Sequence, residues 1–230
     1  MSDDVSALHL VLTADPALIA IVELSLLVSL SALFFSAVIG IPFGALMALT
    51  RFPAREGAIV ALNAMMGLPP VVVGLAIFLL LSHSGPLGEW GLLFTPQAMV
   101  IAQTVLVAPI IAALTRQTIE DLWVEYREEL GAMDVGPLRR IMTLIWDARF
   151  SLVTALLAGF GRAAAEVGAI IIVGGNIDGF TRTMTTAIAL ETSKGDLPLA
   201  IGLGMVLISI VVLINALAWG ARRAGERYAG

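Results

Sequence analysis

The chain has 230 residues, of which 59% are hydrophobic and 13% are charged, with a formal net charge of −5 and no cysteine. Soluble domains are about 45–50% apolar, and the excess here lies in runs long enough to cross a bilayer, which takes about 20 residues per helix. The composition therefore excludes a soluble globular protein, and the lack of cysteine excludes a disulfide framework and a thiolate metal site. We expect an all-α integral membrane protein that forms one transmembrane domain over residues 1–230, holds no metal and binds no nucleic acid.

Five apolar runs, each a candidate membrane-spanning helix, follow one another along the chain. The first is longer than one span needs, so we expect a lead-in that contains Glu23, followed by a helix that bends at Pro42. The third and fifth runs begin with a capping side chain and a proline in the first turn, at Thr95-Pro96 and at Asp196-Leu197-Pro198. The five predicted spans are Ala17–Leu49, Ala58–Ser82, Pro96–Thr115, Phe150–Val173 and Leu197–Gly220.

Basic residues gather on one side of the predicted membrane. Two follow the first span, five lie between the third and the fourth, and three follow the fifth, so that ten of the 13 Lys and Arg residues share one side. By the positive-inside rule this side is cytoplasmic, which places the N-terminus outside and the C-terminus inside. The ten residues are Arg51, Arg55, Arg116, Arg127, Arg139, Arg140, Arg149, Arg222, Arg223 and Arg227.

The second span carries two consecutive prolines near its middle. Each proline removes a backbone donor and clashes with the preceding turn, so the helix must break or kink there. The freed backbone groups must face protein or a water-filled cavity rather than lipid. Two interpretations stay open: a kink packed against neighbouring helices, or a constriction in a transport path, because interrupted helices near the midplane point to substrate sites in transporters. The residues of that constriction would be Pro69, Pro70, Val71, Val72 and Val73.

The longest cytoplasmic segment, residues 116–149, mixes charged and apolar side chains. Gly131 and Gly136 separate two helical stretches, and Pro137 suits the first turn of the second. The segment is either an interfacial amphipathic helix or a docking element for a soluble partner, in which a short helix protrudes sideways.

Arg162 and Glu166 form a charged pair inside the fourth span. Arg162 lies about 18 Å from the start of the span at Phe150, which is near the midplane. An unpaired arginine there costs about 2.5–3.5 kcal/mol, and the glutamate four residues later offsets part of that cost. The pair either fixes the packing between helices or borders a conduit, where Arg162 attracts an anion and Glu166 keeps the site from becoming a trap.

The fourth span ends in glycines and leads into the largest outer loop. Gly168, Gly174 and Gly175 permit either close approach between helices or an irregular exit, and the amide of Asn176 would lie at the outer mouth, where it can donate to an oxyanion. The sequence of residues 176–196 predicts a short helix that is capped by Thr181 or Thr183 and ends near Gly195. This helix either dips into the outer leaflet or forms a platform for an external binding protein.

The cytoplasmic segment resembles the coupling motif of permease subunits of binding-protein-dependent ABC importers: Glu-Ala-Ala, three residues, Gly, nine residues, Ile, one residue, Leu-Pro. Glu125, Gly131 and Ile141 fall at the matching spacing, whereas Tyr126-Arg127 replaces the two alanines and Thr143-Leu144 replaces Leu-Pro. The resemblance implies that the segment inserts into a cleft on an ATP-binding subunit and transmits its closure. The residues implied in that contact are Glu125, Glu128, Glu129, Gly131, Ala132, Met133, Gly136 and Ile141.

Several stretches resemble the molybdate and tungstate permeases, and together they cover about residues 60–180. They are LPPVVVGLAIFLLLSHSGPLG (68–88), GLLFTPQAMVIAQ (91–103), WDARF (146–150) and GFGRAAAEVGAIIIVGGNI (159–177). This resemblance implies a type I importer fold with five transmembrane helices in a bacterial or archaeal cytoplasmic membrane. It further implies tungstate as the substrate, with molybdate or another oxyanion as the alternative. The implied partners are a second copy of the chain, two ATP-binding subunits and an extracytoplasmic solute-binding protein.

The chain is not expected to be an enzyme. The phosphate-binding pattern G-x-x-x-x-G-K-[ST] is absent, and the one lysine, Lys194, follows Ser193 in the outer loop. If ATP drives transport, a partner subunit binds it, and this chain needs no cofactor. An ion-coupled secondary transporter usually has several buried carboxylates, whereas Glu166 is the only acid deep in a predicted span. A membrane scaffold without transport would have no need of prolines in the middle of a span.

Overall fold

The computed structural model describes residues 16–229, and within that range every regular element is a helix. Three helices are long and apolar enough to cross a membrane: α2 (Pro16–Leu49), α5 (Pro96–Ala132) and α10 (Leu197–Ala229). Two pairs of shorter helices reach the length of a span only when each bent pair is taken together, which gives up to five spans among the described residues. These pairs are Arg55–Met66 with Pro70–Leu81 and Pro137–Asp147 with Arg149–Ala164. The predicted all-α membrane fold is confirmed.

The long helices differ from the sequence prediction at their ends. α2 is one continuous helix from Pro16, so the separate lead-in around Glu23 is wrong, and the helix continues through Pro42. α5 runs 17 residues beyond the predicted end of its span at Thr115 and carries the first half of the cytoplasmic segment with it. The hydropathy pattern marks where a helix leaves the lipid, whereas the helix itself ends only where its backbone hydrogen bonds end.

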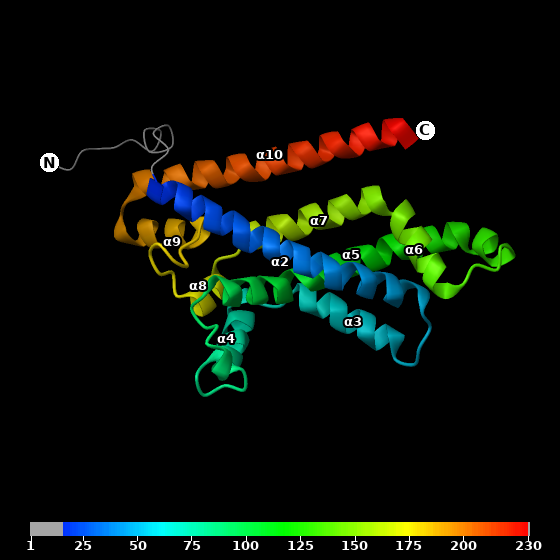
Figure 1. The fold of residues 1–230 in the computed structure, drawn as a ribbon, viewed down its shortest axis with the longest axis horizontal. Helices are drawn as coiled ribbons and strands as arrows, with labels where there is room; N and C mark the ends of the chain where they lie inside the picture. The colour runs from blue at the N-terminus through cyan, green and yellow to red at the C-terminus, as the bar shows by residue number, and fades with distance from the viewer. Residues whose placement is uncertain (1–15, 230) are drawn as a thin grey trace.

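Close contact between α2 and α5 forms the centre of the molecule, and small residues permit it. A Cβ atom added to Gly44 would lie 2.3 Å from the carbonyl oxygen of Ala112, and one added to Gly40 would lie 2.9 Å from that of Ala108. Ser36, also on α2, donates from its hydroxyl to the carbonyl of Thr104. α7 (Arg149–Ala164) packs against both helices, and the three run roughly along the long axis of the molecule (Figure 1).

The second predicted span is broken, as its prolines predict. α3 (Arg55–Met66) and α4 (Pro70–Leu81) meet at an angle of 98°. Pro69 has an extended backbone, and Pro70 is the first helical residue of α4, where the missing N–H costs nothing. α4 therefore leaves the direction of the long helices, which is visible in Figure 1. A short 3₁₀ turn (Gly88–Trp90) lies in the connection to α5.

The fourth predicted span is also broken, which the sequence does not predict. α7 ends at Ala164, and a separate helix, α8 (Gly168–Gly174), begins after a gap of three residues. α4 and α8 pack closely against each other. The expectation of a continuous helix over Phe150–Val173 is therefore corrected: the segment changes course at Ala165–Val167.

The two short connecting helices are where the sequence predicts them. α6 (Pro137–Asp147) starts with Pro137 in its first turn and meets α7 at 72°, so it runs in a different direction from the long helices. α9 (Met184–Lys194) is capped by Thr183 and ends at Gly195 (φ +86°). α6, the α2–α3 connection and the C-terminal end of α10 share one end of the molecule, whereas α8 and α9 lie toward the other (Figure 1). The ten basic residues assigned to the cytoplasm belong to the elements of that first end, to the start of α3, to the C-terminal half of α5 and to the first residue of α7.

Candidate functional site

The charged pair of the fourth span forms an ion pair at the break between α7 and α8. Arg162 Nη1 lies 2.6 Å from Glu166 Oε2. The side chain of Glu166 is 3% exposed and that of Arg162 is 29% exposed, so the carboxylate is inside the protein and the guanidinium reaches the surface. The arrangement puts a partly exposed positive charge at the break and its neutralising partner behind it.

Glu166 does not lie on the same helix as Arg162, contrary to the simple helix-face prediction. Arg162 is in the last turn of α7, whereas Glu166 follows the end of that helix. The second oxygen of its carboxylate, Oε1, accepts a hydrogen bond of 3.0 Å from the backbone N–H of Ala169, in the first turn of α8. A carboxylate at a helix N-terminus satisfies an unpaired donor and interacts favourably with the helix dipole. Glu166 thus joins the two halves of the broken span.

Two side chains from other helices satisfy the backbone of the break. Gln103 of α5 donates from Nε2 to the carbonyl of Ala163 at 3.0 Å, and Thr185 of α9 donates from Oγ1 to the carbonyl of Glu166 at 2.8 Å. The sequence prediction missed both residues. A glutamine within the apolar run of α5 was the available signal, because a buried polar side chain must find a partner.

The breaks of the two interrupted spans lie next to each other. A Cβ atom added to Gly168, at the start of α8, would lie 2.9 Å from Val71 Cγ2, 3.7 Å from the Val71 nitrogen and 3.7 Å from Glu166 Oε1. The first turns of α4 and α8 therefore meet beside the Arg162–Glu166 pair. The sequence suggested residues 69–73 and the Arg162–Glu166 pair separately as parts of one pathway, and the structure brings the two groups together.

The predicted constriction residues do not all reach the surface. Pro69, Val71 and Val72 are exposed and Pro70 is partly buried. Val73, on the opposite face of α4, is buried against α5 and α8. We therefore correct the prediction for Val73: it supports the surface of α4 instead of forming it.

The residues predicted at the outer mouth end α8. Gly174 is buried against Met99, so at this position the glycine permits close packing between α8 and α5, the first of the two predicted alternatives, and its predicted place in the pathway is corrected. Gly175 is exposed and has φ +73°, which favours glycine. Asn176 (φ +50°) donates from Nδ2 to the carbonyl of Thr186 at 3.4 Å, so its amide is already engaged with α9.

The predicted coupling residues surround the turn between α5 and α6. Glu125, Glu128 and Glu129 are exposed on the last turns of α5. Gly131 and Ala132 belong to the last turn of that helix, so the predicted break at Gly131 is wrong, and the break falls at Met133–Gly136. Ile141 is partly buried in an apolar cluster with α5, so it anchors α6 to the body. The opposite face of α6 presents Leu138, Met142 and Trp146 at a spacing of four residues, all exposed.

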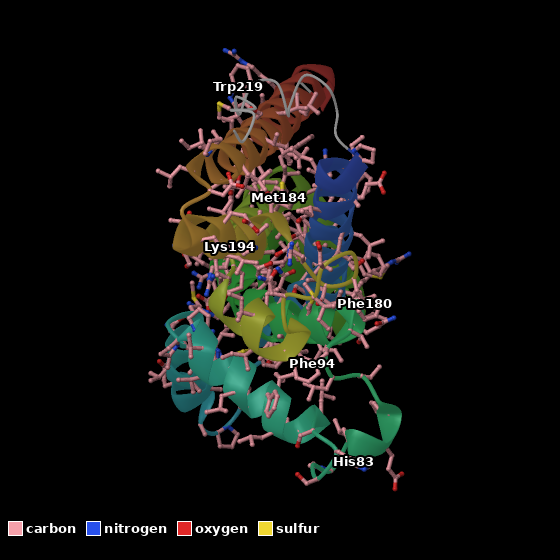
Figure 2. All side chains as sticks on the ribbon, turned by 90° about the vertical axis from the view of Figure 1, so that its left-hand side faces the viewer. His83, Phe94, Phe180, Met184, Lys194 and Trp219 are labelled. Carbon is pink, nitrogen blue, oxygen red and sulfur yellow. The ribbon has the colours of Figure 1, made fainter. Side chains whose placement is uncertain are left out.

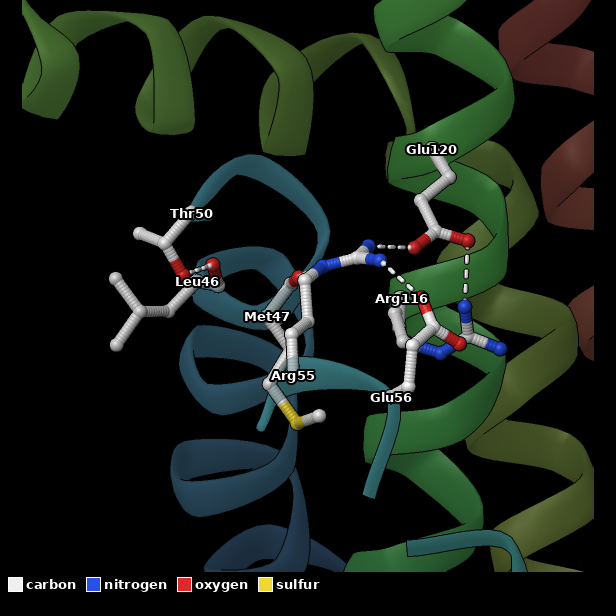
Figure 3. Close-up of polar contacts among 7 residues, drawn as sticks. All are labelled: Leu46, Met47, Thr50, Arg55, Glu56, Arg116 and Glu120. Carbon is white, nitrogen blue, oxygen red and sulfur yellow. Dashed lines mark hydrogen bonds and ion pairs between the residues drawn. The ribbon is translucent and has the colours of Figure 1, made fainter. Parts of the chain in front are cut away.

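A polar network holds the α2–α3 turn near this end, and the sequence prediction missed it (Figure 3). Arg55 at the start of α3 forms an ion pair with Glu120 of α5 and donates from Nε to the carbonyl of Met47 at 3.1 Å. Arg116 pairs with the other oxygen of Glu120. One carboxylate thus ties α3 and the end of α2 to the part of α5 that leads to α6.

The end of the molecule that carries α9 is viewed in Figure 2. Phe94 and Phe180 lie toward the outside of this end, whereas Met184 lies among the helices. Within residues 16–229, no group of three or more His, Asp or Glu side chains is arranged to hold a metal ion.

Comparison with known proteins points to one family. No family model matches the chain. A probable anion ABC transporter permease of Haloferax volcanii is 40% identical over 210 residues, which cover 89% of this chain and 90% of the relative. The tungstate uptake permeases TupB of Peptoclostridium acidaminophilum and Campylobacter jejuni are 38% and 36% identical, over 93% and 94% of this chain and over 94% and 91% of their own lengths. A permease fold is also found in an inward-facing structure of the MetNI methionine ABC transporter, with a TM-score of 0.69, 20% identity, and coverage of 90% of this chain and 95% of that one.

Proposed function

The chain belongs to the family of ABC transporter permeases that includes the anion permease of Haloferax volcanii and the tungstate uptake permeases of Peptoclostridium and Campylobacter, and we propose that it forms the membrane path of a tungstate importer. In this proposal the membrane is the cytoplasmic membrane of a bacterium or an archaeon. The chain performs no chemistry on the oxyanion. It alternates between outward-open and inward-open states, and ATP hydrolysis in a partner subunit drives the change.

The observation that carries this proposal is the meeting of two interrupted spans beside the Arg162–Glu166 pair. An oxyanion near this point would be attracted by the guanidinium of Arg162 and by the N-terminal end of α4. The carboxylate of Glu166 behind the arginine lowers the net positive charge. Transport requires such weak binding, since an ion that binds tightly does not leave. Pro69, Val71 and Val72 would form the apolar side of the same passage.

Coupling to ATP hydrolysis would occur at α6. Its exposed face of Leu138, Met142 and Trp146 has the size and apolar character of an anchor for a cleft on another protein. A displacement of α6 would reach α7 directly through their joint at 72°. The displacement would be passed along α7 to Arg162, which lies in the final turn of that helix. This geometry favours a docking element over a helix that only lies at the membrane surface.

Two copies of the chain are proposed to enclose the path, since five spans of one copy barely surround a conduit. A two-fold arrangement would let the breaks of both copies face each other across a common axis. Two ATP-binding subunits would then dock at the α6 ends. The solute-binding protein would dock at the opposite end, where α9 and residues 176–183 form the surface.

The proposal is tested by purifying the chain with its co-expressed ATP-binding subunits and measuring ATP hydrolysis in lipid vesicles. We expect the tungstate-loaded binding protein to stimulate hydrolysis, and Arg162→Ala to abolish tungstate uptake while Arg223→Ala, at the far end of α10, leaves it unchanged. Equal stimulation by the molybdate-loaded protein would replace tungstate with a broader class of oxyanion. Uptake that follows an ion gradient and ignores ATP would overturn the proposal in favour of a secondary transporter.

A further inference from the structure

A cluster of buried polar side chains lies between α2, α5, α9 and the break of the fourth span. Gln103 is 1% exposed, and four hydroxyl side chains around it are also buried. These hydroxyl groups belong to Ser25, Ser29, Thr183 and Thr185. At membrane depth, polar groups without partners are costly, so each of them needs a hydrogen bond.

Some of these groups already serve the backbone around them. Gln103 Nε2 and Thr185 Oγ1 donate to the two carbonyls of the break, as described above. Ser25 Oγ accepts a hydrogen bond of 2.7 Å from the N–H of Met184 at the start of α9. α5 and α9 thus hold the irregular backbone of the break, and α2 holds the start of α9.

One buried oxygen of the cluster lacks a partner. Gln103 Oε1 is buried and has no hydrogen-bond partner among the described residues, and the nearby Ser29 is itself only 6% exposed. Both residues line a small, partly open cavity with about 10 Å³ of space for the centre of a water molecule. Ser25, Thr183 and Thr185 line it as well. A buried water needs roughly 10–15 Å³ measured in this way and two to four polar partners, and this cavity offers both.

We propose that one water molecule binds in this cavity between Gln103 Oε1 and Ser29 Oγ, and that Gln103, Thr185 and this water position Glu166. The water donates one proton to the glutamine oxygen and can both donate to and accept from the serine hydroxyl. Both polar atoms of the Gln103 side chain then have a hydrogen-bond partner, and its amide nitrogen stays directed at the carbonyl of Ala163. A tetrahedral oxyanion is too large for the cavity, so the cavity belongs to the frame of the site and not to the path itself.

The consequence for transport rests on the proposed function. Glu166 holds Arg162 and caps α8 only while the break keeps its shape. Without Thr185 the Glu166 carbonyl loses the hydrogen bond from the side chain, and without Gln103 the Ala163 carbonyl keeps only the Glu166 N–H at 3.2 Å, so in both cases the break shifts to find another partner. Gln103 and Thr185 are therefore positioning residues, which act on the passing anion through Glu166 and Arg162.

The water is tested by radiolytic hydroxyl-radical footprinting of the assembled transporter in lipid nanodiscs, with oxidation read by mass spectrometry. Met184 lines the cavity and is 2% exposed, whereas Met99 and Met47 are equally buried, at 0% and 3%, and lie elsewhere. We expect Met184 to be oxidised several-fold faster than both controls, because a radical formed from the bound water reaches it. Ser29→Val fills the cavity, and Ser29→Ala removes one partner of the water; each should lower the oxidation of Met184 to the level of Met99. Equal oxidation of the three methionines in the unchanged protein would overturn the water site.

The positioning role is tested by tungstate uptake in vesicles, expressed per assembled complex. We expect Gln103→Leu and Thr185→Val to lower the maximal rate about tenfold, which corresponds to about 1.4 kcal/mol for one lost hydrogen bond, without a change in KM for the loaded binding protein. Thr185→Ser should restore the rate. The matched control is Thr104→Val, because the Thr104 hydroxyl donates only to Val100 of its own helix.

The outcomes separate this inference from the proposed function. A purely structural role would reduce the amount of assembled complex and leave the rate per complex unchanged, which would overturn the positioning role. Rates of Thr185→Val and Thr104→Val that fall equally would overturn it as well. If the unchanged protein does not import tungstate, the proposed function fails, while the footprinting result still decides the water site.

Discussion

The two interrupted spans reach the same shape by different means. Between α3 and α4 the chain reads Gly67-Leu68-Pro69-Pro70, and two prolines prevent any helix from crossing. Between α7 and α8 it reads Ala165-Glu166-Val167-Gly168, which contains no proline and starts with a good helix former. There the break is held by an ion pair, a helix cap and side chains from α5 and α9. The first break is caused by the local sequence, whereas the second is stabilised by tertiary contacts.

The largest effect is expected from removing Glu166. In Glu166→Ala the cap of α8 is lost and Arg162 keeps a half-buried charge without its partner, which we expect to cost about 2–4 kcal/mol of unfolding free energy and to abolish uptake. Glu166→Gln keeps an acceptor for the Ala169 N–H and should lie between the two. The measurement is thermal unfolding of the purified complex together with tungstate uptake. Glu56→Gln, at an exposed carboxylate, is the control, and a stable Glu166→Ala protein would show that the second break does not depend on this pair.

The second largest effect is expected from the paired change Pro69→Ala and Pro70→Ala. Each proline in a helix interior costs about 3 kcal/mol, so without them α3 and α4 can fuse, which draws Val71 away from Gly168. We expect uptake to fall about tenfold or more. Pro42→Ala is the matched control, because α2 already continues through that proline. Normal uptake by the double variant would mean that tertiary contacts also hold the first break.

The contact between the two interrupted spans should respond to a smaller change. A Cβ atom at Gly74 of α4 would lie 2.8 Å from the Cα of Ala169 in α8, and backbone cannot yield as a side chain can. We expect Gly74→Ala to cost about 1–3 kcal/mol by forcing the two helices apart. Gly161→Ala on α7 meets no atom within 4 Å and should be neutral or slightly stabilising. Chemical unfolding of both variants checks the difference, and equal stabilities would disprove close contact at this point.

The smallest effect is expected at the N-terminal end of α3. Glu120→Gln weakens the pairs with Arg55 and Arg116, but these side chains are partly solvated, so we expect a loss of about 0.5–1 kcal/mol. The loss should shrink at high salt because exposed charges are screened. Unfolding at low and at high salt measures this. A larger loss that does not depend on salt would mean that the network fixes the first break from a distance.

Much of the fold follows from features that lie close together in the sequence. The apolar runs predict the spans, Thr95 and Thr183 cap the helices that follow them, and Pro69-Pro70 marks the first break. The candidate site was predicted only in part. Arg162 and Glu166 were identified because charged side chains are costly within an apolar span. Gln103 and Thr185 were not identified because their hydrogen-bond partners on other helices are known only from the tertiary structure.

The amino-acid sequence by itself determined the membrane class, the side on which the basic residues lie and the break at the prolines, because hydropathy, charge and proline geometry act within a few residues. Only the tertiary structure decided the second break. Its carbonyls bond to side chains 60 and 19 residues away, and these distant partners replace hydrogen bonds that the backbone gives up where it leaves the helix.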